Sequence, residues 1–256
     1  MSQIIDLHTR RQETDPSRYA ANIETEPMQV RRGEAHVAQA PNLNASRALQ
    51  ATTHYTLPGD TMVQAYHMMD AHHCDMPVQE LRAGDIVRTL DFGFQTVFWV
   101  GSHVLTNYHG HKQVRFAPGS IGNADTILVA PNHQLMLWHP AAEDLFGVNE
   151  ILVEARHLVN ETDVINVATT TTEFFQILFS RHQIIFADGV PSASLYVNSR
   201  ALGSYDPEHR NEWVKALPDL QDTYMNRYGS TVRRVLSEQE VRMLQSLGGF
   251  RSGGGN

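Results

Sequence analysis

The sequence has a single cysteine, Cys74, among its 256 residues. One cysteine cannot form an intramolecular disulfide, and such usage is typical of a reducing compartment. The sequence also has no run of 18 apolar residues, which a membrane-spanning helix needs. Its beginning has no apolar stretch of the kind found in secretory signal peptides. We therefore expect a cytoplasmic protein that does not enter a membrane.

Positive charge is also scarce. The chain has 20 lysines and arginines against 28 aspartates and glutamates, which gives a net charge of −8. Basic residues do not form a stripe, because Arg31–Arg32 and Arg233–Arg234 are isolated pairs. Nucleic-acid binding depends on clustered positive charge. The composition thus argues against nucleic acid or an anionic membrane surface as a partner.

Large apolar residues are few in residues 1–50. This part of the chain is polar and is interrupted by Pro16, Pro27 and Pro41. Such a composition cannot bury enough apolar surface to offset the entropy lost on ordering. We predict a disordered polar N-terminal arm over residues 1–50.

Residues 51–200 have a different pattern, which predicts a meandering β domain. Short runs rich in β-branched and aromatic residues are separated by turn residues such as Pro58-Gly59-Asp60 and Asp188-Gly189. The runs recur about every ten residues, as in all-β domains. The expected strands are Thr61–Ala65, Asp85–Thr89, Thr96–Val104, Val114–Phe116, Thr126–Val129, Gln134–Trp138, Glu150–Glu154, Val164–Val167, Phe174–Phe179 and Gln183–Phe186.

Residues 201–256 are expected to form a short helical extension with a flexible, glycine-rich end. One helix is predicted over Asp206–Ala216, with Asp206 as the N-cap. A second is predicted over Ser237–Leu247, where Ser237 and Glu240 have the spacing of a capping box. Val241, Leu244 and Leu247 would lie on one face of this second helix, because they recur at three-residue spacing.

Four segments of the β region form a recognisable series. They are, in order, Leu57–Val63 with Pro77–Val87, Ile127–Leu137, Glu154–Asn160 and Ile177–Gly189. Together they resemble the bacterial Hint (Hedgehog/intein) domain family. The second segment contains Ala130-Pro131-Asn132-His133, which is similar to the family's "S/T-P-x-H" block. The last contains Arg181-His182, which is similar to the closing "F-x-R-H" block.

The resemblance implies a mainly β, Hint-type fold over residues 51–200. It also implies an autocatalytic activity in which a thiol or hydroxyl attacks the preceding peptide carbonyl, so that the substrate is the protein's own polypeptide and no cofactor takes part. Such a reaction needs a nucleophile and a group that protonates the leaving nitrogen.

The same resemblance assigns roles to two histidines. His133 matches the histidine that acts as the general acid, and His182 matches a histidine near the reaction centre. Each could instead be structural, His133 by ordering a turn and His182 by ordering the last hairpin. Ala130 stands where the family has Ser or Thr, so the hydroxyl that orients the scissile amide is missing.

The nucleophile position is degenerate. Aligning on Thr61 places Thr56 at the first position of the family, and aligning on Pro58-Gly59 places Tyr55 there. Neither is cysteine or serine, and the secondary hydroxyl of Thr56 is hindered. Cys74 is expected in a loop between the first two strands, as a reactive or an inert thiol. Splicing also requires a terminal His-Asn pair, which Val197-Asn198 does not supply.

The 14 histidines raise a metal-site alternative, that of a metal-binding β-barrel. His109-Gly110-His111 has the H-x-H spacing of such barrels, but no carboxylate follows within a few residues. His72-His73-Cys74 has no second ligand pair at zinc spacing. We therefore assign no metal, and we interpret His67, His103 and His139 as hairpin or loop residues.

Two functional hypotheses remain from the sequence. One is an enzyme that cleaves its own backbone before Thr56 or Tyr55, with His133 and His182 in the site. The other is a Hint-type scaffold that has lost this activity and serves as a binding or structural module. The missing nucleophile and the alanine at position 130 favour the second hypothesis.

Overall fold

The computed structural model describes residues 56–67, 72–106, 112–169, 171–197, 207–217 and 228–253. All of these belong to one unit, residues 41–256. The predicted N-terminal arm over residues 1–50 lies outside the described residues.

The described residues form mainly β-strands, as the sequence predicts. The strands are β1 (Leu57–Pro58), β2 (Met62–His67), β3 (His72–Pro77), β4 (Ile86–Thr89), β5 (Gly93–Thr96), β6 (Trp99–Thr106), β7 (Lys112–Phe116), β8 (Ile127–Val129), β9 (Gln134–Trp138), β10 (Glu150–Glu154), β11 (Val164–Ala168), β12 (Thr171–Leu178), β13 (Ile184–Ala187), β14 (Val190–Ala193), β15 (Arg234–Val235) and β16 (Arg251–Ser252). The helical elements are α2 (Pro140–Phe146), α4 (Pro207–Ala216), α6 (Glu238–Leu247) and the 3₁₀-helices η2 (Val78–Glu80) and η4 (Ala155–Leu158).

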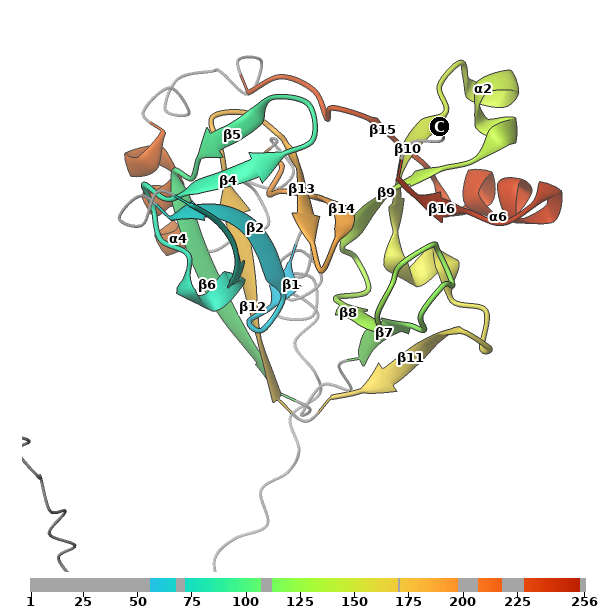
Figure 1. Ribbon diagram of the computed structural model, residues 1–256, viewed down its shortest axis with the longest axis horizontal. Helices are drawn as coiled ribbons and strands as arrows, with labels where there is room; N and C mark the ends of the chain where they lie inside the picture. The colour runs from blue at the N-terminus through green and yellow to red at the C-terminus, as the bar shows by residue number, and fades with distance from the viewer. Residues whose placement is uncertain are drawn as a thin grey trace, which may run out of the picture. The chain divides into compact units, whose positions relative to one another are not determined.

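Within the described part of the chain, these strands form three sheets. The largest has the strand order β15-β10-β9-β14-β13-β2-β4-β5, with β16 paired to β9 and β3 paired to β2. The two smaller sheets have the orders β1-β12-β6 and β11-β7-β8. Figure 1 shows β13 and β14 between one half that contains β2, β4, β5, β6 and β12 and another that contains β7, β9, β10, α2 and α6.

Each half has its own apolar cluster. The cluster of the first half includes Val63, Val87 and Ile185, which are buried in the largest sheet. The cluster of the second half includes Leu135 and Val153. The central strands of the largest sheet therefore contribute side chains to both cores, and the two halves are joined through β13, β14 and β9.

The first predicted turn requires glycine because of a close approach. A Cβ atom at Gly59 would lie 2.9 Å from Oε1 of Gln79 and 3.0 Å from Cε2 of Phe175. Any side chain at this position would displace a neighbour. The glycine thereby allows the turn after β1 to pack against η2 and β12, and it fixes the position of the residues just before it.

The predicted turn at Asp188-Gly189 closes the hairpin of β13 and β14. Asp188 and Gly189 both have positive φ angles, 48° and 76°, which suits a two-residue hairpin turn. Oδ1 of Asp188 also accepts a hydrogen bond of 2.8 Å from the backbone N–H of Met62. The turn is thus tied to the beginning of β2.

The C-terminal helix forms as the capping box predicts. The Ser237 side chain accepts a hydrogen bond from the backbone N–H of Glu240, and the Glu240 carboxylate accepts one of 2.7 Å from the backbone N–H of Ser237. Val241 and Leu244 are fully buried in the core of the second half. Leu247, in contrast, is 59% exposed, so the predicted apolar face ends one turn earlier.

Several elements differ from the sequence predictions. The expected strand Thr96–Val104 is two strands, β5 and β6, because the chain bends at residues 97–98 to pair with other segments. The loop expected around Cys74 is strand β3, which pairs with β2 along its whole length. Strand β14 and helix α2 were not predicted. α2 has Pro140 in its first turn and Gly147 at its C-cap, which are recognisable helix signals.

Candidate functional site

The histidine of the second family-like segment lies in a tight turn between β8 and β9. The backbone N–H of His133 donates a 3.0 Å hydrogen bond to the carbonyl of Ala130. The carbonyl of His133 accepts from the N–H of Ala155, and that of Pro131 accepts from the N–H of Arg156, at 2.9 and 2.8 Å. Backbone hydrogen bonds therefore fix this turn against η4.

The imidazole of His133 has an unusual environment. Its side chain is fully buried, and neither ring nitrogen has a hydrogen-bond partner among the residues that the structure describes. Burial lowers the pKa of His133 to about 3, because the charged form would lose its hydration. His133 is consequently neutral at neutral pH.

His182, from the closing segment, is also buried but is held by neighbours. Its Nδ1 accepts a 3.2 Å hydrogen bond from the backbone N–H of Val232, and its ring meets that of Tyr196 edge-on at 5.3 Å. Burial lowers the pKa of His182 to about 4, and a hydrogen bond with the backbone of Ser194 opposes this effect. Because Nδ1 is an acceptor, the proton of the neutral ring is on Nε2.

Thr56, the predicted first residue, is fully buried just before β1. The register of β1 with β12 pairs Leu57 with Phe175, so that Thr56 lies beside Gln176. β1 also lies against β8, the strand that leads into the turn of His133. Tyr55, the alternative first residue, lies outside the described residues.

The strand register brings the two histidines into one neighbourhood. Ser192 of β14 pairs with Leu135 of β9, and continuing this register by two residues places Ser194 across from His133. On its other side, Ser194 exchanges hydrogen bonds with Gln183: its N–H donates to the Gln183 carbonyl, and its Oγ accepts from the Gln183 N–H, both at 2.9 Å. Ser194 therefore lies between the chain segments that carry His133 and His182.

The same segment continues toward Thr56. The N–H of Leu195 donates a 2.9 Å hydrogen bond to the carbonyl of Ile177, the neighbour of Gln176 on β12. The segments that carry Thr56, His133 and His182 are thus each linked, through a neighbouring residue or strand, to Ser194–Leu195.

Sequence reasoning missed the glutamines that surround this region. Gln134, Gln176 and Gln183 are at most 4% exposed, and each is next to strongly apolar residues, Gln134 and Gln176 within a strand and Gln183 just before β13. Oε1 of Gln134 and Oε1 of Gln183 have no hydrogen-bond partner among the described residues. An isolated polar residue in an apolar strand is the signal that could have identified them.

The position of Cys74 corrects the expected loop. Cys74 lies in β3 opposite Ala65 of β2 and is partly exposed. It lines a surface pocket of about 550 Å³ together with Asp75, Arg88 and Phe94. The thiol is therefore part of the largest sheet, whereas Thr56 precedes a strand of a different sheet.

His139 lies in the connection between β9 and α2, as expected, and it also caps the helix. Its Nδ1 accepts a 3.2 Å hydrogen bond from the backbone N–H of Ala141 at the beginning of α2. Its ring is fully buried and lies 5.2 Å from that of Phe250 near the C-terminus. His139 thus has a structural role, which its position just before Pro140 could have indicated.

A further polar group, partly buried, belongs to the third family-like segment. Glu154 pairs with Arg156 at 2.5 Å and with Nε2 of His157 at 3.5 Å. Burial raises the pKa of the Glu154 carboxyl, which the adjacent arginine partly counteracts, and burial lowers the pKa of His157. Across the described residues, no group of three or more His, Cys, Asp or Glu side chains has the arrangement of a metal site. His109 and His111 lie outside them.

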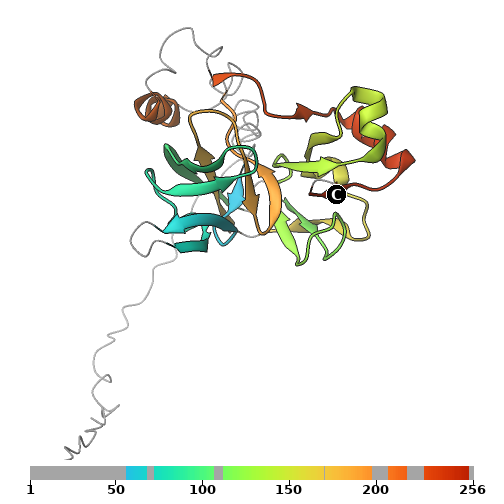
Figure 2. The same cartoon turned by 45° about the horizontal axis from the view of Figure 1, so that its top comes forward.

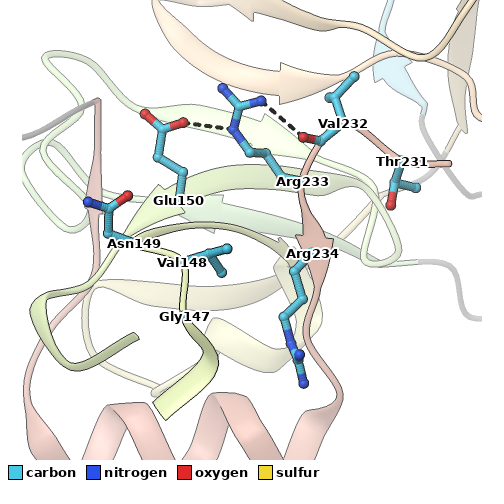
Figure 3. A pocket seen from close by; sticks show the side chains of 8 residues that line it. All are labelled: Gly147, Val148, Asn149, Glu150, Thr231, Val232, Arg233 and Arg234. Carbon is cyan, nitrogen blue, oxygen red and sulfur yellow. Dashed lines mark hydrogen bonds and ion pairs between the residues drawn. The ribbon is translucent and has the colours of Figure 1, made fainter. Parts of the chain in front are cut away.

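A second pocket, of about 460 Å³, lies between the end of α2 and the segment before β15 (Figure 3). Residues 147–150 line one side and residues 231–234 line the other. Figure 3 shows the guanidinium of Arg233 joined to the carboxylate of Glu150. This pocket is next to Val232, which contacts His182, but it is separate from the turn of His133.

The fold and the site define a mainly β domain in which the family-like segments meet at a turn and a hairpin. Residues 60–199 match the family model of the Hint domain. This match spans more than half of the chain, and the chain belongs to the Hint domain family.

Solved structures give a consistent but weaker comparison. A DnaB intein from Synechocystis is 10% identical with a TM-score of 0.37, and the match covers 55% of this chain and 98% of the intein. A bacterial intein-like domain from Clostridium thermocellum is 12% identical with a TM-score of 0.35, covering 55% and 98%. The VidaL intein is 20% identical with a TM-score of 0.34, covering 54% and 96%.

No curated protein matches the sequence. Among the described residues, no helix is both long enough and apolar enough to cross a membrane.

Proposed function

We propose that this chain is a Hint domain whose self-cleavage is weak or lost, and that the fold now serves as a binding or structural module. The observation that supports this most directly is the state of His133. The residue at the position of the family's general acid is buried, neutral and without a hydrogen-bond partner among the described residues.

A general acid must carry a proton when the bond breaks. With a pKa of about 3, His133 would be protonated in roughly one molecule in 10⁴ at pH 7. Ala130 has no hydroxyl that could orient the amide, and its side chain packs instead against Phe174. Both functions that the family assigns to this turn are therefore weakened.

The nucleophile is weakened as well. In the self-cleavage reaction of the family, Oγ of Thr56 would attack the carbonyl carbon of residue 55, and the bond from this carbon to the Thr56 nitrogen would break. The nitrogen would gain a proton, and an ester would replace the amide. A threonine hydroxyl is far less acidic than a cysteine thiol. The side chain of Thr56 is also buried, and the sequence pattern assigns no residue that would accept its proton.

The intact mass of the full-length chain, expressed between two tags, tests the proposal. The protein is incubated alone, with dithiothreitol and with hydroxylamine, which cleaves esters and thioesters. We expect the full-length mass under all three conditions. A fragment that begins at Thr56 or Tyr55 would contradict the proposal and establish self-cleavage.

A pair of gain-of-function substitutions tests whether the missing side chains alone account for a loss of activity. Thr56→Cys combined with Ala130→Thr restores the two side chains that the family pattern requires. We expect slow cleavage before position 56 in dithiothreitol, because the buried His133 would still be protonated in only a small fraction of the molecules. The matched control adds His133→Ala, which should abolish this cleavage if His133 retains the position of the acid. Absence of cleavage in the double variant would show that more than these two side chains has been lost.

Slow cleavage before Thr56 is the second candidate. It is favoured by the burial of Thr56 beside Gln176 and by the proximity of β1 to β8. In this case the protein's own N-terminal segment is the substrate, and His133 and His182 take part. Thr56→Ala should then remove the hydroxylamine-dependent fragment, whereas Thr61→Ala, five residues later, should leave it unchanged.

A further inference from the structure

A segment beyond the family match covers His182. Residues Tyr228–Val235, here called the strap, end in β15, which pairs with β10 in parallel. Figures 1 and 2 both show the strap, in orange to red, crossing from the half that contains β5 to the half that contains β10. The Hint match ends at residue 199, so the strap is an addition to the matched domain.

Two hydrogen bonds attach the beginning of the strap to the segment that follows β14. The hydroxyl of Tyr228 donates a 2.9 Å hydrogen bond to the carbonyl of Leu195. The hydroxyl of Tyr196 donates a 3.0 Å hydrogen bond to the carbonyl of Gly229. Tyr196 is also the residue whose ring contacts His182.

The middle of the strap contacts His182 directly. The backbone N–H of Val232 donates to Nδ1 of His182. The side chain of Val232 packs against the buried cluster that contains Met136 and Leu152. The position of Val232 therefore determines two properties of His182: its imidazole is covered, and its Nδ1 is the nitrogen that accepts a hydrogen bond.

The next residue, Arg233, anchors the strap to both halves. Its guanidinium binds Glu150 of β10 at 2.7 Å and Asp91, in the turn between β4 and β5, at 2.6 Å. All three side chains are between 21% and 29% exposed, so the ion pairs are only partly shielded from water. The pocket of about 460 Å³ lies beside the strap (Figure 3), which leaves this side of the strap without close packing. On this side, the two ion pairs of Arg233 hold the strap together with the pairing of β15 with β10 and the ion pair of Arg234 with Glu240.

We propose that Arg233 is a positioning residue for His182: by binding Asp91 and Glu150 together, it holds the strap so that the Val232 N–H keeps the His182 ring buried with Nδ1 as acceptor. The inference rests on the proposed function in one respect, because it takes His182 as part of the Hint site. Its test measures the histidine itself, so its outcome does not depend on cleavage.

Ring nuclear magnetic resonance of the full-length protein labelled with ¹⁵N-histidine tests the proposal. His182→Gln identifies the His182 signals by their loss. In the wild type, His182 should titrate near its lowered pKa of about 4 and show an unprotonated Nδ1. In Arg233→Ala, the pKa should rise by about two units toward its ordinary value of 6.5, and the preference for the Nε2-protonated tautomer should decrease.

Two variants show that the effect comes from this anchor. Arg242 pairs with Glu238 on the exposed face of α6, and Arg242→Ala should leave the His182 titration unchanged. Arg233→Lys keeps the charge but cannot bind both carboxylates as the planar guanidinium does, so its pKa should lie between those of wild type and Arg233→Ala. An unchanged His182 titration in folded Arg233→Ala would overturn the proposal.

If Arg233→Ala does not fold, Asp91→Ala provides the same test with a change at an exposed turn. It removes the anchor to the first half and leaves the ion pair with Glu150. A rise in the pKa of His182 supports the proposal. An unchanged titration overturns it, because the strap would then be held over His182 without Arg233 bridging the two halves.

Discussion

The surroundings of the two family-block histidines differ, although both rings are fully buried. His133 lies in a turn whose backbone is well fixed, but its ring has no hydrogen-bond partner among the described residues. His182 accepts an N–H from Val232 and contacts Tyr196. Burial lowers the pKa of both, to about 3 for His133 and about 4 for His182.

The difference shows that the two positions have separate physical roles. An unsatisfied buried polar group costs about 1–3 kcal/mol, so His133 reduces the stability of the fold. Such a cost is typical of functional sites, or of sites that have lost a partner. His182, in contrast, contributes to the attachment of the C-terminal strap. The remaining predictions are designed to separate these two environments.

The largest effect of a single substitution should come from creating a cavity in the core on the side of His133. Leu244 of α6 is buried in the same cluster as Leu135 and Leu137 of β9, the strand that follows His133. Leu244→Ala should lower the free energy of unfolding by about 3 kcal/mol, from lost burial and a residual cavity. Urea unfolding followed by tryptophan fluorescence measures the change. Leu247→Ala removes the same atoms from a 59% exposed side chain and should change stability by less than about 0.5 kcal/mol.

A further effect should come from lowering the pH, which should decrease the free energy of unfolding because both buried histidines are neutral in the folded state. Their folded pKa values lie below the unfolded value of 6.5, so the unfolded state binds more protons below pH 6.5 and stability falls as the pH decreases. Between pH 6.5 and pH 5, each histidine should remove about 2 kcal/mol of stability. Urea unfolding at pH 7 and pH 5 measures this loss.

His133→Leu provides the comparison for that pH effect. The variant should lose about 2 kcal/mol less than the wild type between the two pH values, because it lacks one of the two buried bases. The carboxyl of Glu154, whose pKa burial raises, acts in the opposite direction but equally in both proteins. An identical loss in both proteins would show that His133 does not remain neutral in the folded state.

The smallest effect should distinguish the two rings at neutral pH. His182→Leu leaves the N–H of Val232 without its acceptor and should cost about 1–2 kcal/mol. His133→Leu breaks no hydrogen bond to the ring among the described residues, and its stability should be equal to or higher than that of the wild type. Thermal unfolding of both variants at pH 7 measures the contrast. An equal loss in both would remove the distinction between the histidines.

Much of the fold could be predicted because its central strands are apolar on both faces. The predicted Gln134–Trp138 and Glu150–Glu154 are the observed bounds of β9 and β10. β3 was missed because His-His-Cys-Asp-Met-Pro has a loop-like composition, and its pairing with β2 determines its structure. β14 was missed because Pro191 is unusual inside a strand.

The candidate site could be predicted only in part, since local motifs describe local structure. The turn of His133 is contained in four consecutive residues, so the sequence pattern was sufficient to indicate it. The hydrogen bond that covers His182, in contrast, joins it to Val232, which is 50 positions away in the sequence. No periodicity or turn signal connects Val232 with His182, and no charge pattern connects Arg233 with Asp91. Such contacts are determined by tertiary packing.

The pairing of the C-terminal strands also determines where the chain can be shortened. β15 occupies the outer edge of β10, and β16 pairs with β9. A chain ending at residue 199, where the family match ends, would expose the backbone edge of β10 and the apolar side chains that Val241, Leu244 and Phe250 cover. Unpaired edges next to apolar surface promote aggregation. The family boundary is therefore a poor choice for expression of this domain, and a soluble form should extend at least to Ser252.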